Sequence, residues 1–358
     1  MKQLLKAASL VILMSTISFY NVYAGNDDRS GQAGANELLI NPWGRTSGWA
    51  NANTANVRGL ESMGLNIAGL AFTKKTEMMF ANTSWLRGTD IKMNAFGFSQ
   101  KLGKDGGVLA VSIMSMNFGD IDITTTELPE GGIGKFSPRF MNMGIGFAKE
   151  FSNSIYGGVN VKIISESIAD LKSQGVAFDA GIQYHTTIGA KAKEQKIKNV
   201  KFGIALRNVG PPLSFSGDGL STRATLPLTG TSLTVEQRST KFELPALINI
   251  GGAYDYYLME EKHRVTGCMN FTSNSFIKDQ FCFGVEYAYK SMFMGRVGYA
   301  YESKKDGIKV NALTGPTAGF TVELPLNKEK GTAFGLDYGY RFTNPFAGCH
   351  TIGVKLTL

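Results

Sequence analysis

The sequence predicts an all-β protein: a closed antiparallel transmembrane β-barrel of about 14 strands with an N-terminal plug segment. Three observations lead to this fold class. The chain begins with a short apolar run typical of an export signal. After residue 75, apolar residues alternate with small or charged ones. The alternating segments are joined by short and long connections in turn, as in barrels that cross a membrane.

Residues 1–24 have the features of a secretory signal peptide. Lys2 and Lys6 precede an apolar run over 7–19, which is shorter than the roughly 20 residues that a membrane-spanning helix needs. Small residues follow at the spacing that precedes a cleavage site. We therefore expect the mature chain to begin at Gly25; the alternative is an uncleaved anchor helix.

The overall composition fits a barrel better than a helical membrane protein or a nucleic-acid-binding protein. Mean hydropathy is close to zero, which a barrel allows because only every second residue faces lipid. Cleavage of the signal would leave 35 basic and 29 acidic residues, a net charge of +6. The densest basic run, over 191–198, contains Glu194 and has no interleaved aromatic residues. We read it as a solvated turn and expect no nucleic-acid partner.

Strands are predicted wherever the alternation is sustained. In 281–289 every odd position is Phe, Val or Tyr. In 334–342 the apolar residues are interleaved with Gly335, Asp337, Gly339 and Arg341. The predicted strands fall near 76–85, 91–102, 106–117, 138–151, 154–166, 175–187, 198–208, 242–256, 262–274, 279–290, 292–303, 315–325, 331–343 and 348–358. An even number of segments about 10–13 residues long fits tilted strands that cross a bilayer.

The direction of the apolar face decides between a membrane barrel and a water-soluble one. In a membrane barrel the apolar face points outward, toward the lipid. Lipid offers no hydrogen-bond partners to the backbone groups of an open sheet edge, so the last strand must pair with the first. Charged residues then project into the lumen, where pairing among them and with the plug would fill the space: Lys162, Arg207, Arg264, Arg296, Asp179, Glu286, Glu323 and Asp337. A water-soluble barrel would place these charges outside.

Loop lengths predict the orientation. The two longest connections, 118–137 and 209–241, follow the third and seventh strands and should share the external side, while 188–197 should lie on the periplasmic side. Tyrosines gather near both ends of the strands, as expected for a bilayer with two interfaces. We therefore expect residues 76–358 to form the barrel domain. We expect this domain to lie in the outer membrane of a Gram-negative cell, in contact with the membrane lipid.

Residues 25–75 do not follow the alternation. They are rich in Gly, Ala and Asn, and they contain Trp43 and Trp49. Small residues permit close approach inside a crowded lumen, so we predict an N-terminal plug segment and negligible conductance; a disordered periplasmic tail is the alternative.

Several stretches in order resemble the PorV/PorQ family of outer-membrane proteins. They are 33–40, 45–52, 66–71, 161–168, 175–181, 207–213 and 243–246. The resemblance implies a fatty-acid-transporter-like barrel of the Bacteroidetes. It also implies a role as a type IX secretion accessory protein, which binds or shuttles the C-terminal signal domain of secreted cargo or scaffolds its surface attachment. The implied partners are the secretion translocon and that cargo domain. An alternative function is a channel for hydrophobic small molecules.

Nothing in the sequence indicates an enzyme, a cofactor or a metal site. His185, His263 and His350 are far apart among the predicted strands. The glycine-containing loops lack the strand-to-helix context of a phosphate cradle. Cys268 and Cys282 fall on the lumen face of adjacent predicted strands, so either a cross-strand disulfide or two free thiols is expected.

The long loop 209–241 is the predicted partner contact. It carries more apolar residues than an external loop needs for solubility: Pro211, Pro212, Leu213, Phe215, Leu220, Leu226 and Leu233. The alternative is a loop that folds back and caps the lumen, with Phe215 and Leu220 pointing inward.

Overall fold

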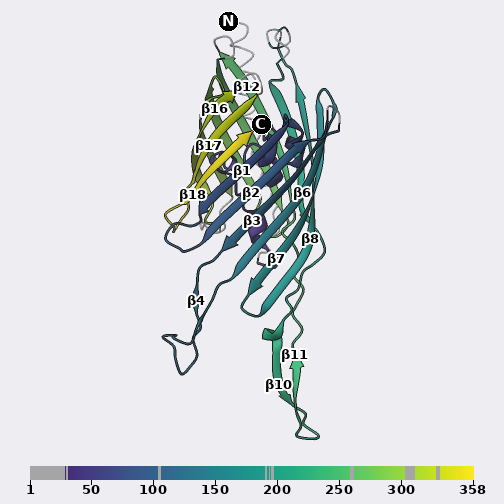
Figure 1. Ribbon diagram of the computed structural model, residues 1–358, viewed down its shortest axis with the longest axis vertical. Helices are drawn as coiled ribbons and strands as arrows, with labels where there is room; N and C mark the ends of the chain where they lie inside the picture. Colours follow the sequence, from purple (N-terminus) through teal and green to yellow (C-terminus); the bar gives the residue numbers. More distant parts are fainter. Residues whose placement is uncertain are drawn as a thin grey trace, which may run out of the picture.

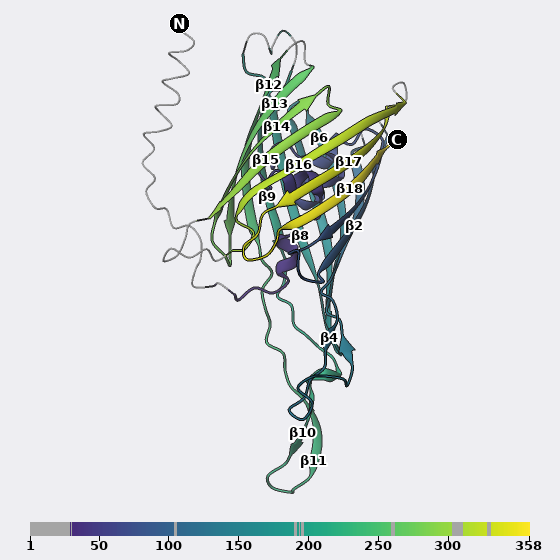
Figure 2. The same cartoon turned by 90° about the vertical axis from the view of Figure 1, so that its left-hand side faces the viewer.

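The computed structural model describes residues 29 and 31–358, apart from 104–105, 190–191, 193, 195–196, 259–261, 303–310 and 328–330. The predicted signal peptide therefore lies outside the described residues. Two views at right angles show one tilted barrel with helical turns inside it and two long projections from one end (Figures 1 and 2).

Fourteen antiparallel strands close the barrel, which confirms the predicted fold class. The strands are β1 (Thr76–Ser84), β2 (Lys92–Lys101), β3 (Val108–Asn117), β6 (Arg139–Ser152), β7 (Ile155–Ile168), β8 (Leu171–Thr186), β9 (Val200–Val209), β12 (Leu247–Leu258), β13 (His263–Asn274), β14 (Gln280–Tyr289), β15 (Phe293–Glu302), β16 (Gly315–Asn327), β17 (Thr332–Arg341) and β18 (Cys349–Thr357). Each pairs with its neighbours in the chain, and β1 pairs with β18 in a register that sets Phe80 opposite Val354. The largest differences from the predicted bounds are β8, which begins at Leu171, and β12, which begins at Leu247.

Along the strands, every second side chain points outward, and these outward side chains are mostly apolar. On β14, Phe283 and Val285 are about half exposed, whereas Cys282 and Glu286 are buried. A surface band of this composition suits lipid and not water, so the water-soluble alternative is wrong. Among the described residues, no helix is long and apolar enough to cross a bilayer.

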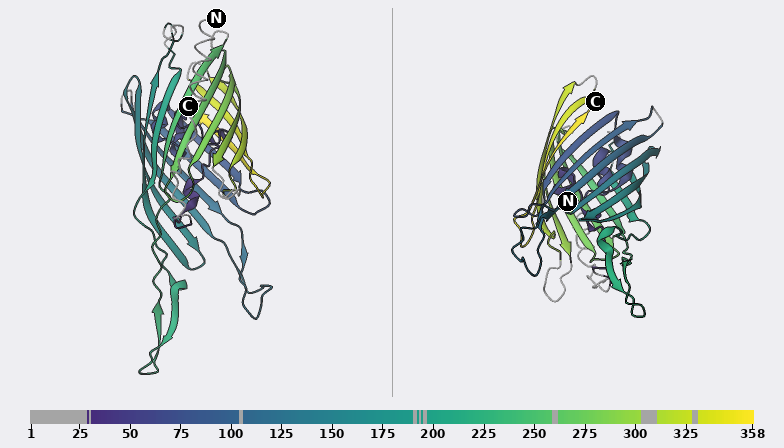
Figure 3. Two further views of the ribbon diagram at one scale, coloured as in Figure 1. Left: turned by 180° about the vertical axis from the view of Figure 1, so that it is seen from behind. Right: turned by 60° about the horizontal axis from the view of Figure 1, so that its bottom comes forward.

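The two ends of the barrel differ in their connections. We call the end that carries the connections after β3 and β9 the long-loop end and the opposite end the short-turn end. Both connections project from the same end as two-stranded hairpins, one formed by β4 (Ile121–Asp122) and β5 (Lys135–Phe136), the other by β10 (Ser221–Thr225) and β11 (Ser232–Glu236) (Figure 3). The C-terminus lies at the short-turn end (Figure 2).

The plug lies inside the barrel, as predicted. Its helical turns are η2 (Asn36–Leu39), α2 (Gly44–Gly48), η3 (Gly59–Gly64) and η4 (Ile67–Phe72). The first of these lies near the long-loop end, and the segment then runs through the lumen to β1, which begins at the short-turn end (Figure 2). Trp43 and Trp49 are almost wholly buried. The alternative of a periplasmic tail does not apply to the described residues of this segment.

Glycines on the inner wall let the plug approach the strands closely. A Cβ on Gly339 would lie 2.3 Å from the carbonyl oxygen of Gly44, and one on Gly298 would lie 2.7 Å from the backbone of Trp49. Gly203 would meet the plug backbone at the same distance of 2.7 Å. Because these positions have no side chain, wall and plug backbones pack directly against each other.

Charged side chains fill the lumen in pairs, as the alternation predicted. Lys162 contacts Asp179 at 2.7 Å, and Arg296 and Arg264 contact Glu286 at 3.0 and 3.1 Å. Pairing offsets the cost of removing these groups from water.

Candidate functional site

A cavity of about 590 Å³ lies between the plug and the barrel wall at the long-loop end. We call it the loop-end cavity. Its floor is formed by the plug, including Ile40, Asn51 and Leu65, and its walls by inner faces of the strands and by the loops between them. The size lies within the range of pockets that bury small organic ligands, about 300–1,000 Å³.

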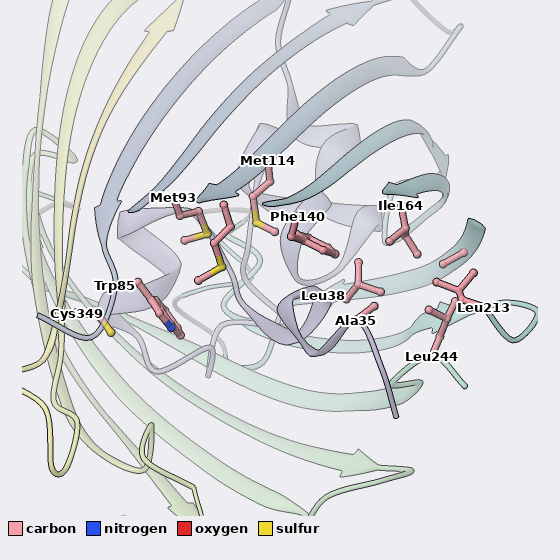
Figure 4. Packing of buried hydrophobic residues seen from close by; sticks show 12 residues of the cluster. Ala35, Leu38, Trp85, Met93, Met114, Phe140, Ile164, Leu213, Leu244 and Cys349 are labelled. Atoms are coloured by element: carbon pink, nitrogen blue, oxygen red, sulfur yellow. The ribbon is translucent and has the colours of Figure 1, made fainter. Parts of the chain in front are cut away.

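Apolar residues make up much of this wall because an inward-facing cluster surrounds the start of the plug. Figure 4 shows Met93, Met114 and Phe140 next to one another on the wall, with Trp85 beside Cys349. The cluster residues that also line the cavity are Ile40, Trp85, Leu86, Ile91, Met116, Phe118 and Leu313. The cavity thus continues an apolar core that the plug does not completely fill.

The described charged residues of the cavity come from separate elements. Lys278, Arg207 and Arg341 are basic, and Glu37 and Glu302 are acidic. Glu302 accepts a hydrogen bond from Gln280 at 3.1 Å. Burial raises the pKa of the Glu37 carboxyl above its ordinary value, although a hydrogen bond from its own backbone opposes this.

An N-terminal arm, residues 29 and 31–40, crosses the cavity opening. Arg29 forms an ion pair with Glu243 at 2.6 Å, and its guanidinium lies 4.3 Å from the ring centre of Phe276. Ala33 makes a parallel bridge with Glu243. The arm therefore ties the loop after β9 to the loop after β13 above the cavity, since Phe276 is itself a wall residue.

A second cavity, of about 610 Å³, lies at the short-turn end and is lined mainly by polar groups. The plug residues Trp49 and Asn53 line it, whereas Asn51 faces the loop-end cavity. Since the plug separates the two spaces, any molecule that crosses the barrel along its axis has to displace part of the plug.

The seven apolar residues predicted in the long loop lie in different surroundings. Leu213 is buried against Leu244 at the barrel rim (Figure 4). Phe215 and Leu220 are partly buried, and the ring of Phe215 packs on Phe242 with centres 5.6 Å apart. Pro211 and Pro212 are exposed, as are Leu226 and Leu233 at the β10–β11 hairpin. The structure brings none of the seven into the wall of the loop-end cavity.

The histidines and cysteines form no common site among the described residues, which contain no group of three or more potential metal ligands. His263 contacts the hydroxyl of Tyr287 at 2.6 Å, and His350 contacts that of Tyr338 at 2.8 Å. Cys268, Cys282 and Cys349 are all buried free thiols. Cys268 lies opposite Gly284, two residues away from Cys282, so the cross-strand disulfide is not formed.

The loop-end cavity could not be recognised from the sequence. The alternation placed Arg341 on the polar face of its strand, but a cavity depends on how the plug, the loops and the wall fit together. The one available signal was a basic residue near a strand end. Only the register, which sets it opposite Thr317 and Cys349, shows that no acidic residue of the described part of the chain is its strand neighbour.

Comparison with solved structures shows the fold of outer-membrane β-barrel proteins. No family model and no curated protein matches the sequence. The solved structure of the TodX deltaS2S3 mutant, a monoaromatic hydrocarbon channel, aligns with a TM-score of 0.53 at 13% identity, covering 88% of this chain and 97% of that one. The Pseudomonas putida toluene transporter TodX has a TM-score of 0.48 at 12% identity, covering 85% and 93%. A Pseudomonas aeruginosa FadL homologue has a TM-score of 0.48 at 10% identity, covering 87% and 96%.

The chain is therefore an outer-membrane β-barrel protein of the Gram-negative type. The closed barrel, the outward apolar face and the alternating short and long connections are the features of that class.

Proposed function

We propose that this protein binds hydrophobic small molecules at the long-loop end and passes them into or across the outer membrane. The observation that carries the proposal is the loop-end cavity, which is of ligand size, has largely apolar walls and is closed beneath by the plug. The fold likeness to a monoaromatic hydrocarbon channel supports it.

The plug and the arm bound this cavity, so both would control the access of a ligand to it. A plug that separates the two cavities hinders free diffusion of solutes along the barrel axis, so we expect access for a molecule that binds in the apolar space. The ion pair between Arg29 and Glu243 is partly exposed on both sides, so it stabilises the arm only weakly. Displacement of the arm would also break the bridge between Ala33 and Glu243 and expose Leu38, which is buried.

The test is binding of a neutral apolar probe, such as naphthalene, to the full mature chain in lipid nanodiscs. Ala312→Trp would fill part of the cavity from the loop after β15 and should weaken binding several-fold. Ala318→Trp is the matched control, because Ala318 is exposed on the lipid-facing side of β16. Equal binding by both variants and the unchanged protein, with all three folded, would refute a role for this cavity.

A second candidate function is the type IX secretion accessory role implied by the PorV/PorQ resemblance. The observation that favours it is the projecting β10–β11 hairpin, on which Leu226, Leu233 and Val235 are about half exposed and Leu228 is 99% exposed. Several exposed apolar side chains on one hairpin that projects beyond the barrel suit a partner contact. The partners would be the translocon and the C-terminal signal domain of the cargo.

Deletion of residues 214–236 tests this second candidate. The deleted segment lies outside the barrel strands, so the variant should remain a heat-modifiable, membrane-inserted barrel. Loss of cargo secretion or attachment would support the accessory role, and normal secretion would place the contact elsewhere, at the β4–β5 hairpin or on the lipid-facing wall.

A further inference from the structure

The outer wall of the barrel carries three aligned cations at the long-loop end. Lys92 on β2, Arg139 on β6 and Lys172 on β8 are exposed, and the residues that follow them on their strands are buried. The register links them through Asn117 of β3, which lies opposite Lys92 and Arg139, and Ser167 of β7, which lies opposite Arg139 and Lys172. Residues opposite one another in antiparallel strands share a face of the sheet. The five residues therefore form one continuous row, which we call the cation row.

The three cations of the row have no anionic partner in the described part of the chain. Their side chains make no ion pair or hydrogen bond with any described residue. The acids of the adjoining loops are Asp90, Asp120 and Asp170, and Asp120 accepts a hydrogen bond from the hydroxyl of Ser137 instead. Neighbouring cations are two strand spacings apart, about 10 Å, so no two of them lie directly opposite each other.

The wall changes in character from the cation row toward the membrane centre. The next outward positions on the same five strands are mostly polar: Asn94, Ser115, Met141, Ser165 and Gln174. The outward positions after those are all apolar: Phe96, Ile113, Met143, Ile163 and Val176. From the rim inward, the wall therefore presents cations, then amide and hydroxyl groups, then an apolar surface.

The opposite wall has a different composition at the same end. Phe281 on β14 and Tyr299 and Tyr301 on β15 point outward there and are about half exposed. Aromatic residues at this level suit a bilayer interface of any lipid composition. The cation row is thus a local feature of strands β2 to β8, which lie side by side in Figure 1, and not a general requirement of a barrel that crosses a membrane.

We propose that the cation row binds the phosphate groups of a phosphorylated glycolipid in the outer leaflet of the membrane. Long connections of such barrels are external, which sets the row at the level of the outer-leaflet head groups. Clustered Lys and Arg residues at this level attract anionic head groups, and a guanidinium can hold a phosphate through two hydrogen bonds.

The order of the three levels selects this class of lipid. Phosphates would contact the cations, sugar hydroxyls the amide and hydroxyl side chains, and acyl chains the apolar surface beneath. A free phosphate ion would contact only the first level. The inference concerns the outer wall and uses neither cavity of the lumen, so it goes beyond the proposed function.

The experiment measures lipid binding to the full mature chain in detergent by native mass spectrometry. The probe is diphosphoryl lipid A, and we expect a complex with one bound lipid. The triple variant Lys92→Gln, Arg139→Gln and Lys172→Gln should bind at least about tenfold more weakly, because three attractions to phosphate are lost. The double variant Lys92→Arg and Lys172→Arg should bind as the unchanged protein does, since both positive charges remain.

A second triple variant is the matched control. Arg223→Gln, Arg238→Gln and Lys241→Gln remove the same charge from exposed positions in the connection after β9, outside the barrel strands, and should leave binding intact. Both triple variants change exposed side chains, so both should remain heat-modifiable barrels. Equal weakening in the two would show an effect of net charge alone and would overturn the site. Unchanged binding by the first triple variant would overturn it as well.

A comparison of two lipids with one phosphate each tests the class of lipid. Monophosphoryl lipid A carries a sugar head group, and phosphatidylglycerol does not. We expect the unchanged protein to bind monophosphoryl lipid A more tightly, and the first triple variant to lose this preference. Equal affinity of the unchanged protein for the two lipids would overturn the assignment to a glycolipid.

Discussion

Arg296 on β15 donates a hydrogen bond from Nε to Oε2 of Glu286 on β14 at 3.0 Å, and neither side chain is exposed to solvent. The same carboxylate accepts from Arg264 on β13 at 3.1 Å and from Arg45 of the plug at 3.4 Å. One acid thus joins three strands of the wall to the plug.

Glu286→Gln should destabilise the protein by about 3–5 kcal/mol, because it leaves buried arginines without their anion. The measurement is the midpoint of heat modification or of urea unfolding in detergent. Glu323→Gln is the control, since Glu323 is partly exposed and lies 3.7 Å from Lys355; its effect should be about 0–1 kcal/mol. Equal effects of the two substitutions would show that Glu286 does not hold the network together.

The glycine contacts between wall and plug can be tested by adding a side chain. Gly298→Val should displace the plug at Trp49, cost about 1–3 kcal/mol by overpacking and raise the conductance in planar bilayers above the negligible level expected of the unchanged protein. Gly295→Val is the matched control, because it lies on the same strand and a Cβ there would meet nothing within 4 Å. Large, stable channels formed by the unchanged protein would contradict the closed plug.

Orientation in the membrane can be read from cysteine labelling of intact cells. Leu228→Cys, on the projecting hairpin, should react with a membrane-impermeant maleimide, whereas Ile188→Cys at the short-turn end should not. Both side chains are well exposed, at 99% and 59%, so a difference reports the side of the membrane and not burial. Labelling of Ile188→Cys but not of Leu228→Cys would show that the barrel has the opposite orientation in the membrane.

The native thiols provide the background for that experiment. Cys268, Cys282 and Cys349 are buried and unbonded, so they should resist alkylation in the folded protein. After denaturation without reductant all three should be alkylated, as measured by intact mass. A mass increase of two hydrogens on reduction would instead reveal a disulfide.

Much of the barrel could be predicted from the sequence because a lipid-facing wall imposes a period of two. The fourteen strands, the lumen charges and the common end of the two long connections follow from that period and from loop length. The start of β8 could not be predicted from the sequence, because Leu171 to Gln174 extend the strand beyond the segment in which lipid-facing apolar residues alternate with small or polar ones.

The loop-end cavity is harder to predict because it arises from imperfect packing among the arm, the loops and the wall. The alternation identifies Arg341 as a lumen residue, but the lack of a partner for its Nε among the described residues depends on the register of its neighbours, Thr317 and Cys349. Likewise, the spacing of Cys268 and Cys282 is compatible with a cross-strand disulfide, but the register of β13 and β14 sets Cys268 opposite Gly284, two residues from Cys282.

The plug also bears on how the barrel can be assembled. The segment runs from the ion pair of Arg29 and Glu243 at one end of the lumen to Thr76 at the other, and at Gly298, Gly339 and Gly203 the wall backbone lies directly against it. A finished barrel has no room to be threaded by a chain of this bulk. The strands therefore have to wrap around the segment before β1 meets β18, so the plug acts as an internal template whose shape sets the wall that closes on it.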